Sequence, residues 1–222
     1  MTVPAAAASR IGIVSDRRRL AAAAGRDLAD APALLVAQLE VAAEAGVAFY
    51  QLREPDLDVT TLLALARRLV AAAAGRTRVV VNDRADVAAL AGAGVHLKHH
   101  SIDAGRLRPW LPTTTWISQA VHTIDDVHAA GPVDALVAGT AAPSVSKAAG
   151  TPTLGPAGLA ALVGASAVPT FAIGGLTPPD WRWVAASGAY GIAAIGAFLP
   201  RRGEDPGAAT ARAIAAFAAE ID

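Results

Sequence analysis

The stretch RVVVNDRADVAALAGAGVHL, Arg78–Leu97, decides the fold. It opens with a β-branched run, continues through an alanine-rich segment and ends, after two glycines, with a second short apolar run. This order is typical of a βαβ unit, in which a helix connects two parallel strands. We therefore expect strands at Arg78–Asn82 and Gly94–Leu97, with a helix at Arg84–Ala91 between them.

The same alternation extends along the chain in both directions. It predicts further strands at Arg10–Val14, Ala48–Leu52, Thr115–Gln119, Ala135–Ala138, Thr170–Ile173 and Gly191–Ile195. Further helices are expected at Pro32–Ala45, Val59–Ala74, Ile124–Ala130, Leu159–Ala165, Pro178–Ser187 and Gly207–Ile221. Eight short strands buried on both faces predict an α/β fold, the closed (β/α)8 TIM barrel. We expect a single domain over residues 1–222, with residues 1–9 as a loose tail. An open doubly wound sheet would show a glycine-rich turn after its first strand, which IGIVSDRRRL lacks.

The composition limits which kinds of molecule the protein is expected to bind. Lysine plus arginine and aspartate plus glutamate number 19 each, so the bulk attraction for nucleic acid or an anionic membrane is missing. There is no cysteine, which excludes a disulfide scaffold and suits a cytoplasmic enzyme. No uncharged stretch reaches the length of a membrane-spanning helix. A small molecule is the expected ligand.

Polar residues at the carboxyl ends of the strands are the candidate site, because barrel enzymes carry their chemistry there. Gln51 and Arg53 lie two apart and share one face of the second strand, and a buried arginine fork suits phosphate or carboxylate. An ion pair of Arg53 with Glu54 or Asp83 is the alternative. Asn82 ends the third strand, and Asp83 is in a position to cap the helix that follows.

The later strand ends add a histidine and several glycines. His122 follows the fifth strand and could exchange protons near neutral pH. The long loop after the sixth strand carries Lys147. Glycines after the seventh and eighth strands allow backbone amides to approach a phosphate, and loops at these two places commonly hold one. The phosphate-binding candidates are Gly174, Gly175, Ile195 and Gly196.

Taken in order, QLRE, VNDRADVA, GVHL, VH, the loop ending in Lys147, AIGGL and GAYGIAAIGAF resemble the thiamine phosphate synthase / thiazole tautomerase (TenI-like) superfamily from about Arg10 to Leu199. The resemblance implies a (β/α)8 barrel. In that family, a synthase branch joins a pyrimidine diphosphate to a thiazole phosphate with magnesium. A tautomerase branch isomerises a thiazole carboxylate phosphate without metal.

Three departures separate this chain from the synthase pattern. Pro55 stands where synthases have a lysine for diphosphate, Ser101 where they have a carboxylate for magnesium, and Ala120 where they have a serine. The resemblance therefore favours the tautomerase branch: an isomerase of thiamin biosynthesis with no cofactor, His122 as the proton shuttle, and a phosphorylated thiazole as ligand. Arg53 and Lys98 would meet its carboxylate.

Two alternatives remain. One is a thiamine phosphate synthase, a transferase in which Asp83 would bind magnesium and Lys98 or Asp103 would replace lost groups. The other is a non-catalytic barrel that binds a small phosphate. A homodimer is possible through an apolar outer helix face.

The stretch GVHLKHHS also raises the question of zinc, since it holds His96, His99 and His100. His96 and Lys98 share one face of the strand and His99 has the other, and an adjacent ammonium disfavours a divalent cation. The sequence therefore predicts no metal here. Lys98 is expected to lend its charge to an anionic ligand, and no role follows for His99 and His100.

Overall fold

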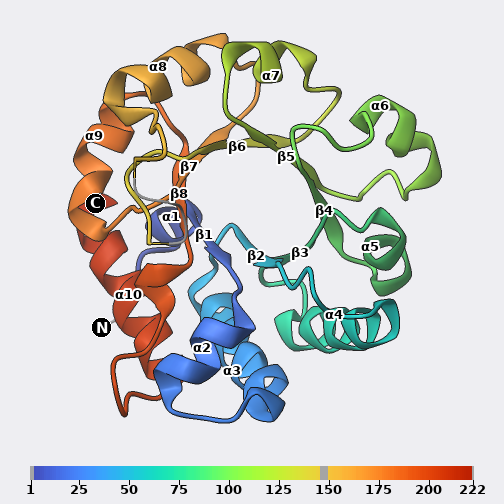
Figure 1. Cartoon of the computed structure of the whole chain (residues 1–222), viewed down its shortest axis with the longest axis vertical. Helices are drawn as coiled ribbons and strands as arrows, with labels where there is room; N and C mark the ends of the chain where they lie inside the picture. Colours follow the sequence, from blue (N-terminus) through green and yellow to red (C-terminus); the bar gives the residue numbers. More distant parts are fainter. Residues whose placement is uncertain (1–2, 146–149, 222) are drawn as a thin grey trace.

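The β-branched segments form a closed barrel of eight parallel strands in the computed structural model, which describes residues 3–145 and 150–221 (Figure 1). Neighbouring strands along the chain are neighbours in the barrel, and β8 pairs with β1. The strands are β1 (Ile11–Val14), β2 (Phe49–Leu52), β3 (Arg78–Asn82), β4 (Gly94–Leu97), β5 (Ile117–Val121), β6 (Ala135–Gly139), β7 (Thr170–Ile173) and β8 (Gly191–Ala194). The expected single-domain (β/α)8 barrel is confirmed.

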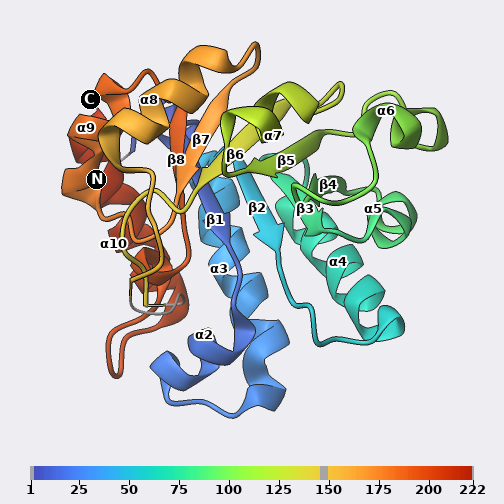
Figure 2. The same ribbon diagram turned by 45° about the horizontal axis from the view of Figure 1, so that its top comes forward.

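Helices surround this barrel on its outside, as both views show (Figures 1 and 2). They are α1 (Ala5–Ala8), α2 (Arg17–Ala24), α3 (Ala31–Ala45), α4 (Val59–Ala73), α5 (Ala85–Ala91), α6 (Ala104–Leu107), α7 (Ile124–Ala129), α8 (Gly155–Ala165), α9 (Trp181–Ala186) and α10 (Pro206–Ile221). Short 3-10 turns lie at Leu28–Asp30, Arg108–Trp110, Pro178–Asp180 and Gly196–Phe198. Among the described residues, no helix is both long and apolar enough to cross a membrane.

The strands bury their side chains on both faces, and the two faces form separate cores. One face packs beneath the helices, where Tyr50, Val79 and Val81 are buried. The other fills the barrel at the amino ends of the strands, with Phe49 and Val80 among its residues. Gly12 makes room there, because a Cβ at Gly12 would lie 2.3 Å from the Phe49 ring. On β2, β3 and β4 the next inward positions toward the carboxyl ends are polar, namely Gln51, Asn82 and His96, and they position the site.

Several elements differ from the sequence-based expectation. Helix α8 begins at Gly155, four residues before the predicted Leu159, and the helix predicted at Pro178–Ser187 is a 3-10 turn followed by α9. β5 begins two residues later than predicted, because a turn closed by the hydrogen bond from Thr115 N to Pro112 O precedes it. The residues expected as a loose tail include α1, whose Ala7 and Ala8 are buried and which packs against α10. Helices α2 and α6 were not predicted, since both are short and depend on aspartate caps, Asp16 in the case of α2.

Candidate active site

A layer of polar side chains lies across the barrel at the carboxyl ends of β2 to β5. Gln51 is buried, and its Nε2 donates to Oδ1 of Asn82, 3.0 Å away. On the next strand pair, Nδ1 of the buried His96 lies 2.9 Å from Oγ of Ser118. The contact of Gln51 with Asn82 follows from strand alternation, since both are inward positions of adjacent strands. His96 and Ser118 extend the layer and were not read as part of it.

His96 is a neutral imidazole at neutral pH. Burial lowers its pKa to about 4, the charge of Asp83 opposes this shift, and the charge of Arg53 adds to it. A neutral ring can share one hydrogen bond with the Ser118 hydroxyl without an unpaired buried charge. At the position of His96 the polar layer is therefore uncharged. The charges at the barrel mouth come from Arg53 and from the loop after β4.

The pKa of His96 predicts a pH-dependent stability. Below its unfolded pKa near 6.5, the unfolded chain takes up a proton that the folded chain refuses, so stability falls as the pH drops from 6.5 towards 4. The full loss amounts to about 3 kcal/mol. Urea unfolding of the wild type and of His96→Gln at pH 7.5, 6, 5 and 4 measures it, because carboxylates contribute to both proteins alike. If the free energies of unfolding of the two proteins changed with pH in parallel, His96 would not titrate in this way.

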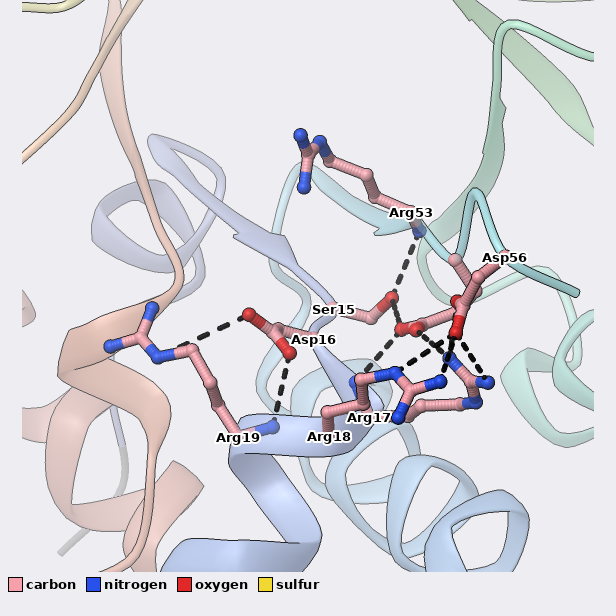
Figure 3. Close-up of polar contacts among 8 residues, drawn as sticks. Ser15, Asp16, Arg17, Arg18, Arg19, Arg53 and Asp56 are labelled. Atoms are coloured by element: carbon pink, nitrogen blue, oxygen red, sulfur yellow. Dashed lines mark hydrogen bonds and ion pairs between the residues drawn. The ribbon is translucent and has the colours of Figure 1, made fainter. Parts of the chain in front are cut away.

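Arg53 directs its guanidinium away from the acidic residues beside it (Figure 3). The backbone N–H of Arg53 donates to Ser15 Oγ at 2.9 Å, and this hydroxyl donates to Oε1 of Glu54 at 2.6 Å. Glu54 and Asp56 are both occupied by Arg17 instead, at 3.3 and 2.6 Å. Among the described residues Arg53 has no ion pair, so the alternative of a pair with Glu54 or Asp83 is wrong.

The buried contacts under Arg53 were missed from the sequence. Arg17 and Glu54 are 8% and 5% exposed, and Arg17 also donates its backbone N–H to Glu54 Oε1 at 3.0 Å. The available signal was Ser15, a hydroxyl directly after β1 at the edge where the other candidates lie. These contacts fix the backbone of the β2 loop, and so the point from which the Arg53 side chain starts.

Arg19 is a second cation that the sequence did not single out. It lies in the first turn of α2, and its Nη2 would lie 3.6 Å from a Cβ at Gly196, in the loop after β8 (Figure 3). Its own Nε is 4.0 Å from Asp16 Oδ2, at the outer limit of an ion pair. Recognition from sequence would have required predicting α2, which turns Arg19 towards the last strand of the barrel.

Asp83 does not cap α5, contrary to one expectation. Its backbone adopts the left-handed region, with φ of 56°, and the residue at the N-cap of α5 is Arg84. The carboxylate instead meets the loop after β4. Oδ2 lies 2.7 Å from Lys98 Nζ, and Ser101 Oγ donates to Oδ1. Partial burial raises the pKa of Asp83, but the hydrogen bonds from Lys98 and Ser101 outweigh it and leave the pKa lowered.

The residues around Asp83 do not fit a magnesium ion. Magnesium takes six oxygen ligands in a near-ideal octahedron and is usually held by carboxylates and phosphate. Asp83 has both oxygens engaged, and its ammonium partner would repel a dication. Asp103, the proposed replacement, accepts from Arg106 N as the cap of α6. Within the described part of the chain, no group of three or more histidine or acidic side chains is placed to hold a metal.

His122 directly follows β5 and lies at the same edge of the barrel. Its Nδ1 bonds to the carbonyl oxygen of Gly139, which can only accept, so Nδ1 carries the proton and Nε2 is the ring atom left for a ligand. The His122 ring packs edge-on against His99 at 4.9 Å, and His99 packs against His100 at 4.6 Å. The β4 and β5 loops are thus joined by three imidazoles in edge-to-face contact.

The glycines after β7 serve a close approach of two loops. Gly175 has φ of 64°, and a Cβ there would lie 2.0 Å from the Pro143 carbonyl oxygen. At Gly174, with φ of 111°, a Cβ would lie 2.7 Å from Thr140 Cγ2. Both glycines are therefore required for the β6 and β7 loops to meet. Ile195 follows β8 and Gly196 opens the next 3-10 turn. Lys147 lies outside the described residues.

The family model and the curated relatives that match this chain agree on one family. A family model described as thiamine monophosphate synthase matches residues 13–198. A thiamine-phosphate synthase from Anaeromyxobacter dehalogenans is 38% identical over 187 residues, covering 83% of each chain. Another from Albidiferax ferrireducens is 34% identical over 209 residues, covering 92% of this chain and 90% of the relative.

Solved structures agree on the fold. A thiamine phosphate pyrophosphorylase from Pyrococcus furiosus superposes with a TM-score of 0.75 at 21% identity, over 99% of this chain and 100% of that one. A 3-hexulose-6-phosphate synthase superposes with a TM-score of 0.61 at 17% identity, over 96% of this chain and 100% of that one. At these identities the likeness shows the barrel alone.

Proposed function

Since the chain belongs to the thiamine monophosphate synthase family, we propose that it is a thiamine-phosphate synthase, a transferase of thiamine biosynthesis. Its substrates would be hydroxymethylpyrimidine diphosphate and a thiazole phosphate. The observation that carries the proposal is the barrel mouth itself, where the Arg53 guanidinium stands free of the neighbouring carboxylates. Arg53 lies two residues beyond Gln51, which forms a neutral pair with Asn82. A free guanidinium beside uncharged hydrogen-bonding groups suits a diphosphate attached to a polar ring.

The expectation of a thiazole tautomerase is wrong. Relatives at 34 to 38% identity over most of the chain are named thiamine-phosphate synthases or putative ones, and none of these names points to the tautomerase branch. The substitutions at Pro55, Ser101 and Ala120 were given too much weight, because residue types were compared without knowledge of their contacts. Ser101 and Lys98 both bond to the carboxylate of Asp83.

The proposed reaction exchanges one bond for another. The bond between the methylene carbon of the pyrimidine and the diphosphate oxygen breaks, and its electron pair leaves with the diphosphate. The ring nitrogen of the thiazole then supplies its lone pair to that carbon, forming the new C–N bond. The products are thiamine phosphate and inorganic diphosphate. Arg53 would stabilise the charge that grows on the departing diphosphate, where preorganised cations contribute most to rate.

The two ends of the substrates would lie at different loops. We assign the diphosphate to the β2 and β4 loops, with Arg53 and Lys98, and the pyrimidine ring to Gln51 and Asn82. The phosphate of the thiazole would bind the backbone amides at Gly174, Gly175, Ile195 and Gly196. Arg19 supports this placement, because its guanidinium lies against the Gly196 loop and would face a phosphate bound there.

Mass spectrometry of a reaction with both substrates tests the function. Thiamine phosphate should form only when both are present, and omission of either substrate is the control. A protein that binds the two compounds and never joins them would instead support a non-catalytic barrel.

His122 is expected to have a small effect on this reaction. No proton leaves carbon during the bond exchange, so an imidazole has no transfer to perform, and its Nδ1 is already held by Gly139. His122→Ala should therefore lower kcat/KM by less than about tenfold, whereas loss of a proton-transfer group typically costs about a hundredfold or more. Steady-state kinetics of the variant measures the difference, with His128→Ala on α7 as a matched control. A loss of several hundredfold would restore a chemical role to His122.

A further inference from the structure

The turn after β4 places a permanent cation beside Asp83. Lys98 Nζ lies 2.7 Å from Asp83 Oδ2, and the Ser101 hydroxyl donates to the other oxygen. The turn is closed on itself, since Ser101 N donates to Lys98 O at 3.1 Å and Lys98 N donates to Ser101 Oγ at 3.0 Å. One four-residue turn therefore delivers an ammonium and a hydroxyl to the same carboxylate.

Asp83 holds the Lys98 ammonium in place but leaves part of its hydrogen-bonding capacity available. An ammonium has three N–H donors, and Asp83 occupies one of them. The Lys98 side chain is 46% exposed, while that of Asp83 is 28% exposed, so the cation is the more accessible partner. The pair cancels the negative charge of Asp83, which would otherwise repel an anion at this edge of the barrel.

A second cation lies near the same position. Arg53 directly follows β2 and Lys98 directly follows β4, and each of these strands pairs with β3, which is directly followed by Asp83. Arg53 and Lys98 thus approach the mouth from β2 and β4, with β3 between them. A diphosphate offers oxygens on two phosphorus atoms, which suits one planar fork and one point charge.

We propose that Lys98, anchored by Asp83 and Ser101, is the resident cation of the diphosphate site, so that this chain binds diphosphate without a divalent metal. The inference deepens the proposed function and rests on it for the identity of the ligand. The proposal explains why the groups around Asp83 do not suit magnesium: the positive charge at this position belongs to the Lys98 side chain. Diphosphate would bind to the two remaining donors of Lys98 and to the Arg53 fork.

Isothermal titration with inorganic pyrophosphate in excess EDTA tests the proposal. The wild type should bind, and Lys98→Gln should bind at least about tenfold more weakly, as expected for a lost charge-assisted contact. Arg106→Gln, at an exposed position on α6, is the matched control and should bind as the wild type does. Thermal unfolding of each variant checks that the fold is kept.

Two results would overturn the proposal: no binding by the wild type until magnesium is added, or equal metal-free binding by the wild type and Lys98→Gln. The outcomes are separable from the proposed function. A chain that makes thiamine phosphate only with added magnesium keeps the function and refutes the role of Lys98. A chain that binds pyrophosphate through Lys98 in EDTA and never couples the substrates keeps the role of Lys98 and refutes the proposed function.

Discussion

Replacing Arg53 by alanine is expected to lower kcat/KM for thiamine phosphate formation by about a hundredfold or more. The side chain is exposed and its guanidinium is free of ion pairs within the described chain, so its charge is available to the leaving diphosphate. Stability should change by less than about 0.5 kcal/mol. The contact that fixes Arg53 uses its backbone N–H, which the substitution leaves in place.

Two further variants isolate the reason for that loss. Arg53→Lys keeps the charge and removes the planar fork, so an intermediate loss of about tenfold is expected. Arg68→Ala, at an exposed position on the outer helix α4, should leave the rate unchanged. Steady-state kinetics with the pyrimidine diphosphate varied measures all three. Wild-type kinetics in Arg53→Ala would remove Arg53 from the site.

Replacing Glu54 by alanine is expected to destabilise the fold by about 3 kcal/mol, because it leaves a buried guanidinium with only part of its partners. Glu54 is 5% exposed and accepts from Ser15 Oγ, from Arg17 N and from the Arg17 side chain. Arg17 keeps its bidentate pair with Asp56, which limits the loss. For a chain of this size such a change lowers the melting temperature by roughly 10 °C.

Urea unfolding compares this variant with Glu40→Ala, at an exposed position on α3, which should lie within about 0.5 kcal/mol of the wild type. Coupling activity of Glu54→Ala should also fall at a temperature where the protein is still folded, because Ser15 loses the acceptor that orients it towards Arg53 N. A stability within 1 kcal/mol of the wild type would mean that water replaces the carboxylate without cost.

Strand alternation made part of the site predictable. Because side chains alternate between the two faces of a strand, Gln51 was placed on the same face as Arg53, and Asn82 was a candidate as the last residue of β3. The hydrogen bond between Gln51 and Asn82 was not predicted. The barrel was predictable because β-branched runs and alanine-rich segments alternate along the chain with little interruption. Boundary errors fell at β5, at the start of α8 and in short helices whose formation depends on capping and packing.

The partners of the charged residues were not predictable. Asp83 looked like a helix cap by position, but its left-handed backbone turns the carboxylate to Lys98 and Ser101, residues fifteen or more positions away. Arg17 takes Glu54 and Asp56 although helix α2 itself was not expected. Such pairs depend on where loops from different strands meet, which local patterns do not encode. The choice of the wrong family branch followed from reading three substitutions, Pro55, Ser101 and Ala120, without the contacts of the residues around them.

Quantifying both products of one reaction tests the central claim most directly. Wild-type protein mixed with the pyrimidine diphosphate and the thiazole phosphate should release thiamine phosphate and inorganic diphosphate in equal amounts, and Arg53→Ala should release little of either. Diphosphate released without thiamine phosphate would show hydrolysis in place of coupling. That result, or the absence of both products from the wild type with and without magnesium, would contradict the account.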